Sequence, residues 1–158
     1  MSRVPDLDSV ATPSVVVDGT TLRANIGAMA ERARVAGLEM RPHSKTHKSV
    51  AVAALQREQG AAGLTVATVR EAECFAAAGV DDLLVAHPPV GQWRLQRLTA
   101  LAKETRVRVV LDSGEAVTPW TLLAGVLVSA SATCGRSTAA SAVAARRPAS
   151  CQLSRSRW

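Results

Sequence analysis

The chain has 158 residues, of which 47% are hydrophobic and 20% are charged, a composition typical of a folded globular protein. It is too short for a complete eight-stranded α/β barrel, which needs about 250 residues. The formal net charge is +6, but all thirteen acidic residues and fourteen of the nineteen Lys and Arg lie before residue 119. The body of the chain is therefore nearly neutral, which weighs against a dedicated nucleic-acid-binding protein.

The cysteines and the N-terminus indicate a cellular compartment. Cys74, Cys134 and Cys151 are an odd number without metal-binding spacing, which argues against a disulfide framework and favours reducing conditions. The N-terminal residues lack the apolar segment of a secretory signal. The longest strongly apolar run, 122–128, is far shorter than the ~20 residues that span a bilayer. We expect a cytoplasmic protein.

Strands and helices are expected to alternate along the first 118 residues. Runs rich in β-branched or apolar residues predict the strands, and apolar residues three and four apart predict the helices. Thr20 or Thr21 is expected to cap the first helix, Gly37 to end it in a left-handed conformation, and Ser49 to cap the second. The expected strands are 12–18, 38–44, 63–68, 82–87 and 106–113, and the expected helices are 20–36, 49–59, 69–78, 90–105 and one that begins at 114–117.

This alternation is the pattern of parallel βαβ units and predicts the α/β class. The pattern alone does not separate part of a barrel from an open sheet. No Gly-x-Gly-x-x-Gly turn and no phosphate-binding Gly-Lys-Ser/Thr loop is present. Residues 119–158 are dominated by Ala, Ser and Arg, which predicts a disordered, low-complexity tail. One hypothesis for this composition is out-of-frame translation of a GC-rich gene.

The stretch 41–48, Arg-Pro-His-Ser-Lys-Thr-His-Lys, concentrates chemically active side chains. On a strand, side chains alternate between faces, so Arg41, His43, Lys45 and His47 would share one face, which would suit an anion. His43 and His47 have the spacing of a helical metal pair, but Pro42 and the strand prediction argue against a helix here.

This stretch belongs to a longer set of motifs. Together with three other segments, it resembles the N-terminal part of the D-threonine aldolase and D-serine dehydratase family. These segments are TPSVVVDGTTLRANI (12–26), GLTVATVREAECFAAAGVDDLLVAHPPVG (63–91) and VRVVLDSGEAV (107–117). Those are fold-type III pyridoxal-phosphate enzymes with an alanine-racemase-like barrel. The resemblance implies that residues 1–118 form about four strand-helix units of a parallel TIM-type barrel, followed by the tail at 119–158.

The resemblance gives Lys45 a catalytic role, because the lysine of the Pro-His-x-Lys-x-His motif forms the Schiff base with pyridoxal 5'-phosphate in this family. A primary amine condenses with an aldehyde only when it is deprotonated, and the cationic neighbours Arg41, His43 and His47 could lower the pKa of Lys45. The bound cofactor would withdraw electrons when a bond at the substrate Cα breaks.

Other residues near the motif are expected to play lesser parts. His43 is expected to support the cofactor, and Thr68 either to face it or to cap the next helix. His87 and Asp112, at the ends of later strands, could line the same mouth. For His47 a cofactor role and a structural role stay equally open. We expect Lys48 to be a solvated surface residue, and Cys74 and Trp93 to lie in the core.

The implied activity is a pyridoxal-phosphate-dependent lyase acting on D-β-hydroxy amino acids. We expect this chain to be a truncated form of such an enzyme, and whether it is active or inactive stays open. Such enzymes form homodimers and carry later barrel strands, a second domain and a divalent metal held by a His and Cys pair, none of which is recognisable in this sequence. Two alternatives stay open: a non-catalytic protein that binds pyridoxal phosphate, and an anion or nucleic-acid binder that uses the basic tail.

Overall fold

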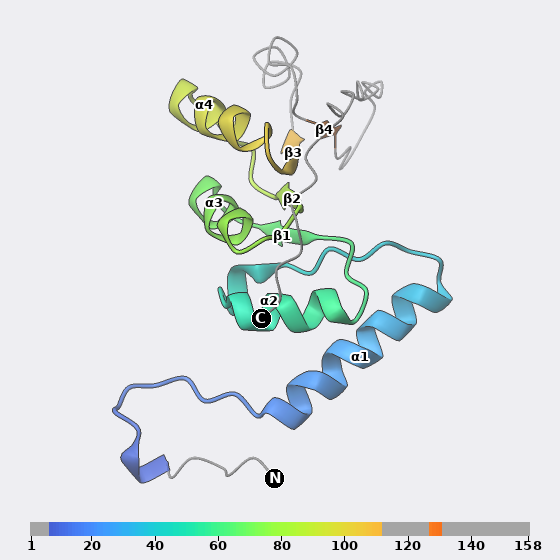
Figure 1. The fold of residues 1–158 in the computed structure, drawn as a ribbon, viewed down its shortest axis with the longest axis vertical. Coiled ribbons are helices and arrows are strands. Elements are labelled where there is room, and N and C mark those ends of the chain that lie inside the picture. The colour runs from blue at the N-terminus through green and yellow to red at the C-terminus, as the bar shows by residue number, and fades with distance from the viewer. Residues whose placement is uncertain (1–6, 112–126, 131–158) are drawn as a thin grey trace, which may run out of the picture.

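The computed structural model describes residues 7–111 and 127–130, and these form an α/β fold (Figure 1). Helices and parallel strands alternate along the chain, as the sequence predicts. In chain order the elements are the 3₁₀ turn η1 (Leu7–Ser9), α1 (Gly19–Val35), the 3₁₀ turn η2 (Ser44–Thr46), α2 (Val50–Glu58), β1 (Leu64–Val66), α3 (Val69–Ala77), β2 (Asp82–Val85), α4 (Gln92–Leu101), β3 (Arg106–Leu111) and β4 (Leu127–Ala130).

The four strands form one parallel sheet in the order β1-β2-β3-β4. The segment before η2 continues this sheet beside β1: the N–H of Ala62 donates to the carbonyl of Met40 over 2.9 Å, and the N–H of Thr65 donates to that of Pro42 over 2.8 Å. Only His43 forms a ladder bridge, with Thr65. The expected strand 38–44 is thus reduced to one bridge, because Pro42 has no N–H to donate and the chain then turns into η2.

The core lies between one face of the sheet and the helices that follow β1 and β2. Alternate strand residues, such as Leu83 and Val85 of β2, are buried against Phe75 of α3 and Leu98 of α4. Figure 1 shows α3 and α4 side by side next to the strands, whereas α1 extends away from them. Because side chains alternate along a strand, the opposite face carries the intervening residues, among them Thr65 and Asp82.

The ends of the helices follow from short-range signals, with one correction. Ser49 caps α2 through its hydroxyl, and Gly37 leaves α1 at a φ of 66°, both as predicted. The cap of α1 is Asp18 rather than Thr20 or Thr21: its carboxylate accepts from the N–H of Thr21 over 2.6 Å. This carboxylate satisfies an amide that the first turn leaves without a helical partner.

The prediction of a strand at 12–18 was wrong. The structure has no strand there, and Val15, Val16 and Val17 are 94%, 61% and 58% exposed. A β-branched run forms a strand only when a neighbouring strand supplies backbone partners, and among the described residues none lies beside this segment. In Figure 1 it leads from η1 to α1, away from the sheet.

The sheet also continues past residue 118, where the folded part was expected to end. Leu127–Ala130 forms β4, which pairs with β3 in parallel, so this part of the expected tail is a strand. The expected helix start at 114–117, Asp112, Cys134 and Cys151 lie outside the described residues. Within the described ranges, no helix has the length and apolar character that crossing a bilayer requires.

Two residues expected in the core lie on the surface instead. Cys74 is exposed, because the buried positions of α3 are Val69, Ala72 and Phe75, three apart, and Cys74 falls outside that stripe. Trp93 of α4 is 58% exposed, and the guanidinium of Arg97 lies 4.6 Å from the centre of its ring. Arg97 also pairs with Glu73 of α3, which links the two helices at the surface.

Candidate functional site

The motif lysine lies at the carboxyl ends of the parallel strands, on the short turn η2. Two backbone bonds hold this turn: the N–H groups of His47 and Lys48 donate to the carbonyl of Ser44 over 3.2 and 2.8 Å. Ser44 itself is fully buried, and its hydroxyl donates to the carbonyl of Thr65 in β1 over 3.1 Å. The turn that carries Lys45 is therefore fixed to β1.

The side chain of Lys45 is exposed, and within residues 7–111 and 127–130 its amine has no hydrogen-bond or ion-pair partner. The 3₁₀ turn also ends the strand-like alternation at Ser44. Side chains alternate between two faces on a strand but not on a 3₁₀ turn. The expected single face of four cationic or titratable groups is therefore not formed.

His43 lies directly before the turn and contacts it. Its Nδ1 accepts from the backbone N–H of Lys45 over 3.2 Å, so the neutral ring carries its proton on Nε2. Burial, and then the positive charge of Lys45, lower the pKa of His43; Glu71 acts in the opposite direction and His87 adds to the lowering. These charges come from η2, the first turn of α3 and the segment after β2, so the structure brings these residues together at one edge of the sheet.

His47 makes structural contacts on both sides of its ring. Its Nδ1 accepts from the N–H of Ser49 over 3.0 Å, which leaves the proton on Nε2. That Nε2 and the Oε1 of Gln56 are both buried and lack a partner with good geometry within the described ranges, but the two groups are close enough for Gln56 to raise the pKa of His47. Burial outweighs this effect and lowers the pKa, so His47 is a neutral link between the turn and α2.

Thr68 acts as the N-cap of α3, where its hydroxyl accepts from the N–H of Glu71 over 3.2 Å. Its exposed side chain also lines a pocket at the carboxyl edge, which it shares with His87, Trp93 and Arg94. The two expected roles of Thr68 are thus compatible: it caps the helix and faces an open pocket.

Glu71 is a site residue that the sequence analysis did not single out. One carboxylate oxygen accepts from the N–H of Ala67 over 2.8 Å, and the other lies 3.3 Å from the amine of Lys48. Burial alone would raise the pKa of Glu71, but the bonds from Ala67 and Lys48 outweigh it and lower the pKa. The sequence signal for this residue is Thr68-x-x-Glu71, the spacing of a capping box.

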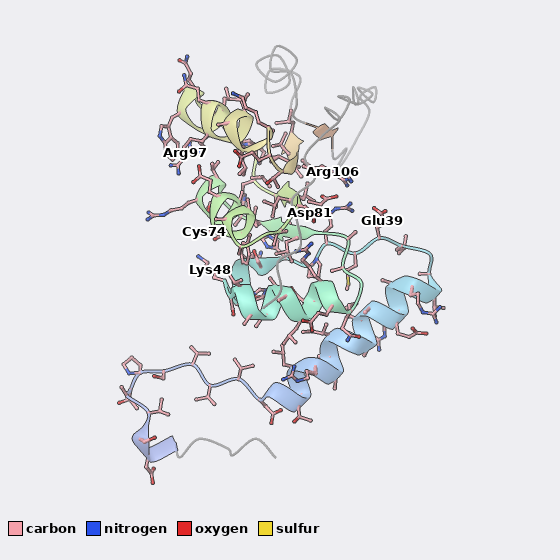
Figure 2. All side chains as sticks on the ribbon, viewed as in Figure 1. Glu39, Lys48, Cys74, Asp81, Arg97 and Arg106 are labelled. Atoms are coloured by element: carbon pink, nitrogen blue, oxygen red, sulfur yellow. The ribbon has the colours of Figure 1, made fainter. Side chains whose placement is uncertain are left out.

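Arg41 belongs to a different cluster. Its guanidinium binds the carboxylate of Asp82 through two nitrogens, over 3.1 and 3.0 Å, and both side chains are largely buried. Arg106 and Arg108 approach the same carboxylate at 3.4 and 3.2 Å. Asp82 and Arg106 begin their strands, so this cluster lies toward the amino ends, and the expected place of Arg41 beside Lys45 was wrong. Figure 2 shows Arg106 on the side of the molecule opposite Lys48.

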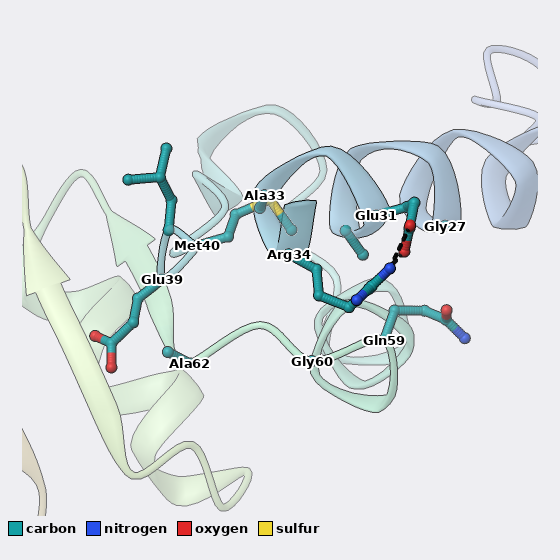
Figure 3. Close-up of a pocket in the computed structure, with 11 residues that line it drawn as sticks. Gly27, Glu31, Ala33, Arg34, Glu39, Met40, Gln59, Gly60 and Ala62 are labelled. Atoms are coloured by element: carbon teal, nitrogen blue, oxygen red, sulfur yellow. Dashed lines mark hydrogen bonds and ion pairs between the residues drawn. The ribbon is translucent and has the colours of Figure 1, made fainter. Parts of the chain in front are cut away.

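A second pocket lies apart from this site, between α1, the end of α2 and the segment before η2 (Figure 3). Small and apolar residues such as Ala33, Met40 and Ala62 line it, and at its rim Arg34 folds back onto Glu31 over 2.6 Å. Across the residues that the structure describes, no three His, Cys, Asp or Glu side chains gather as a metal site would require.

Comparison with known proteins places this geometry in a family. The model of the alanine racemase N-terminal domain matches residues 17–127. The chain belongs to this family. The resemblance that the motifs indicated is confirmed, and with it the α/β class and the TIM-type barrel as the parent fold.

Two relatives and one solved structure show what share of each known enzyme this chain matches. D-threo-3-hydroxyaspartate dehydratase of Delftia sp. (strain HT23) is 41% identical over 102 residues, 65% of this chain and 27% of that protein. D-threonine aldolase of Arthrobacter sp is 36% identical over 107 residues, 68% of this chain and 28% of that one. D-threonine aldolase from Filomicrobium marinum superposes with a TM-score of 0.70 at 30% identity, covering 80% of this chain and 38% of that one. The chain thus spans well under half of each.

Proposed function

We propose that this chain carries the cofactor-binding lysine of a pyridoxal-phosphate-dependent lyase that acts on D-β-hydroxy amino acids. The observation that carries the proposal is the exposed amine of Lys45 on a fixed turn at the carboxyl edge of a parallel sheet. Catalytic groups of barrel enzymes collect at this edge. The names of the relatives, a D-hydroxyaspartate dehydratase and a D-threonine aldolase, support the substrate class.

The position of Lys45 distinguishes it from the other two lysines. The amine of Lys48 is paired with Glu71, and Lys103 lies after α4, before the amino end of β3. Lys45 alone combines an amine without a bonded partner in the described ranges with a place beside His43. This arrangement fits an aldehyde cofactor, which needs one accessible primary amine on a backbone that does not move.

Pyridoxal phosphate, when bound, supplies an electron sink for a bond broken at the substrate Cα. Lys45 would hold the cofactor covalently and, once a substrate amine has taken its place, would be free to move a proton. His43, whose pKa is lowered, would be neutral near pH 7 and could donate a hydrogen bond through Nε2. Thr68 accepts a bond from Glu71 and keeps its own O–H available as a donor.

The test is covalent trapping. Purified protein is mixed with pyridoxal phosphate, reduced with borohydride and digested, and the modified residue is mapped by mass spectrometry. We expect the label on Lys45, its loss in Lys45→Ala and its retention in the matched control Lys103→Ala. Folded wild-type protein without label on Lys45 would overturn the proposal.

Turnover separates the lyase from a protein that only binds the cofactor. Protein loaded with pyridoxal phosphate but not reduced is incubated with D-threonine, which an aldolase splits into glycine and acetaldehyde. A second sample is incubated with D-serine, which a dehydratase converts to pyruvate and ammonia. The borohydride-reduced protein is the control without turnover. Product from either, absent in Lys45→Ala, supports the lyase. Label on Lys45 without product from either substrate would overturn the lyase and leave the cofactor-binding protein.

A further inference from the structure

Glu71 lies where the two loops that frame the site meet. It belongs to the first turn of α3, and its side chain is 13% exposed. Its Oε2 accepts from the N–H of Ala67, in the turn after β1, and its Oε1 lies 3.3 Å from the amine of Lys48, in the segment after η2. One carboxylate therefore joins the turn that carries Thr68 to the segment that carries Lys45.

The backbone at Lys48 has a conformation that needs support. Its φ is 46°, in the left-handed region that a residue with a Cβ seldom adopts. The N–H of Lys48 donates to the carbonyl of Ser44 over 2.8 Å, which closes the turn around Lys45. The conformation of Lys48 thus fixes the direction in which the chain leaves the turn, three residues after Lys45.

We propose that Glu71 is a positioning residue, which holds the Lys45 turn in place through the amine of Lys48. The inference rests on the proposed function, since it concerns the presentation of the Lys45 amine. An exposed ion pair by itself adds little to stability, and 66% of the Lys48 side chain is exposed. The effect is on geometry: the carboxylate is oriented beforehand by Ala67, so the Lys48 amine meets a fixed partner.

A plain capping role is the competing explanation, because glutamate at the third position of a helix also stabilises the first turn. The two roles differ in what they require. Capping needs an acceptor for the N–H of Ala67, which glutamine retains, whereas positioning needs the charge that meets Lys48. Glu71→Gln and Lys48→Met therefore remove the link between the loops and keep the cap, and Lys48→Met keeps a side chain of similar length at the left-handed position.

The experiment is a double-mutant cycle on the full chain with Glu71→Gln, Lys48→Met and both together. The matched control is Glu73→Gln, which removes another paired glutamate of α3, the partner of Arg97. Two quantities are measured: the yield of borohydride-trapped label on Lys45 at subsaturating pyridoxal phosphate, and hydrogen exchange of the His47 and Lys48 amides without cofactor.

We expect each single variant to lower the trapping yield by about tenfold, because a misplaced amine reacts less readily. Exchange of both amides should become faster in each variant. The double variant should be no worse than either single one, because both remove the same link. Glu73→Gln should behave as wild type in both measurements.

The failures can be told apart. Wild-type protein without label on Lys45 overturns the proposed function, and the exchange measurement still tests the link. Wild-type label with unchanged exchange and yield in Glu71→Gln and Lys48→Met overturns the positioning role and leaves the lysine assignment intact. Additive losses in the double variant also overturn it, because the two residues would then act separately.

Discussion

At the scale of single residues, His47 shows how a motif position can serve the fold. Its Nδ1 is occupied by the N–H of Ser49, and its Nε2 lies buried near Gln56. Nothing in this arrangement leaves a ring nitrogen for a cofactor. Of the two roles that the sequence left open, these contacts favour the structural one.

The lowered pKa of His47 predicts how stability depends on pH. An unfolded chain binds a proton to this ring near the ordinary value of 6.5, whereas the folded protein resists protonation. The free energy of unfolding should therefore be fully retained above about pH 6.5 and fall as the pH drops toward the lower folded pKa. His43 contributes in the same direction.

Urea denaturation at about pH 7.5 and about pH 5.5 measures this loss. In His47→Gln, which cannot be protonated, the difference between the two conditions should shrink, even if the variant is less stable at both. A difference as large as that of the wild type would show that His47 does not take up a proton on unfolding.

Gly63 is required by close approach rather than by flexibility. A Cβ at this position would overlap the backbone carbonyl of Asp82 on the neighbouring strand. We predict that Gly63→Ala destabilises the protein by about 1–3 kcal/mol, as overpacking typically does. Gly19→Ala is the matched control, because a Cβ there meets nothing within 4 Å. Urea midpoints would contradict this if both variants shifted equally.

At the scale of elements, the sequence predicted what local signals determine. The helices α1, α2 and α3 begin and end within one or two residues of their expected ranges, since caps such as Ser49 and glycines such as Gly37 mark their ends. Two predictions about strands were wrong: a strand was expected at 12–18, and β4 was not expected. Local signals do not decide these cases. Whether a short apolar run becomes a strand depends on a partner that is remote in sequence.

The same distinction applies to the site. Lys45 was singled out by the motif that resembles the family, and Thr68 by its place between a predicted strand and a predicted helix. The contact of Glu71 with Lys48, and that of Arg41 with Asp82, join segments more than twenty residues apart and left no local pattern. Alternation along one strand was therefore a poor guide once a 3₁₀ turn interrupted it.

The cluster around Asp82 joins three parallel segments at their amino ends. We predict that Asp82→Asn costs roughly 3 kcal/mol, because it removes the buried carboxylate that pairs with Arg41 and leaves Arg41 only the exposed Glu39. The neighbouring Asp81→Asn should cost under about 1 kcal/mol, because the Asp81 side chain is 78% exposed where it pairs with Arg57. Urea denaturation of both variants compares the sites directly; similar costs would mean that the buried cluster adds no special stability.

At the scale of the whole molecule, the excess positive charge and the proposed cofactor-binding lysine lie in different parts of the chain. The five basic residues beyond residue 118 are all arginines and lie past β4. Ending the chain at residue 130 should abolish any salt-sensitive binding to DNA, measured by fluorescence anisotropy, and leave the trapping of pyridoxal phosphate on Lys45 unchanged. Loss of trapping in a shortened chain that still folds would show that residues 131–158 take part in the site.

The octapeptide 41–48 divides between the two edges of the sheet. Arg41 anchors the amino edge, Ser44 fastens the turn to β1, and Lys45 is presented at the carboxyl edge. Under the proposed function, the requirements of folding and those of chemistry therefore fall on neighbouring residues. A descendant that lost catalysis could keep most of the octapeptide for its fold alone, so a genome search that scores the motif as a unit would count such chains as enzymes.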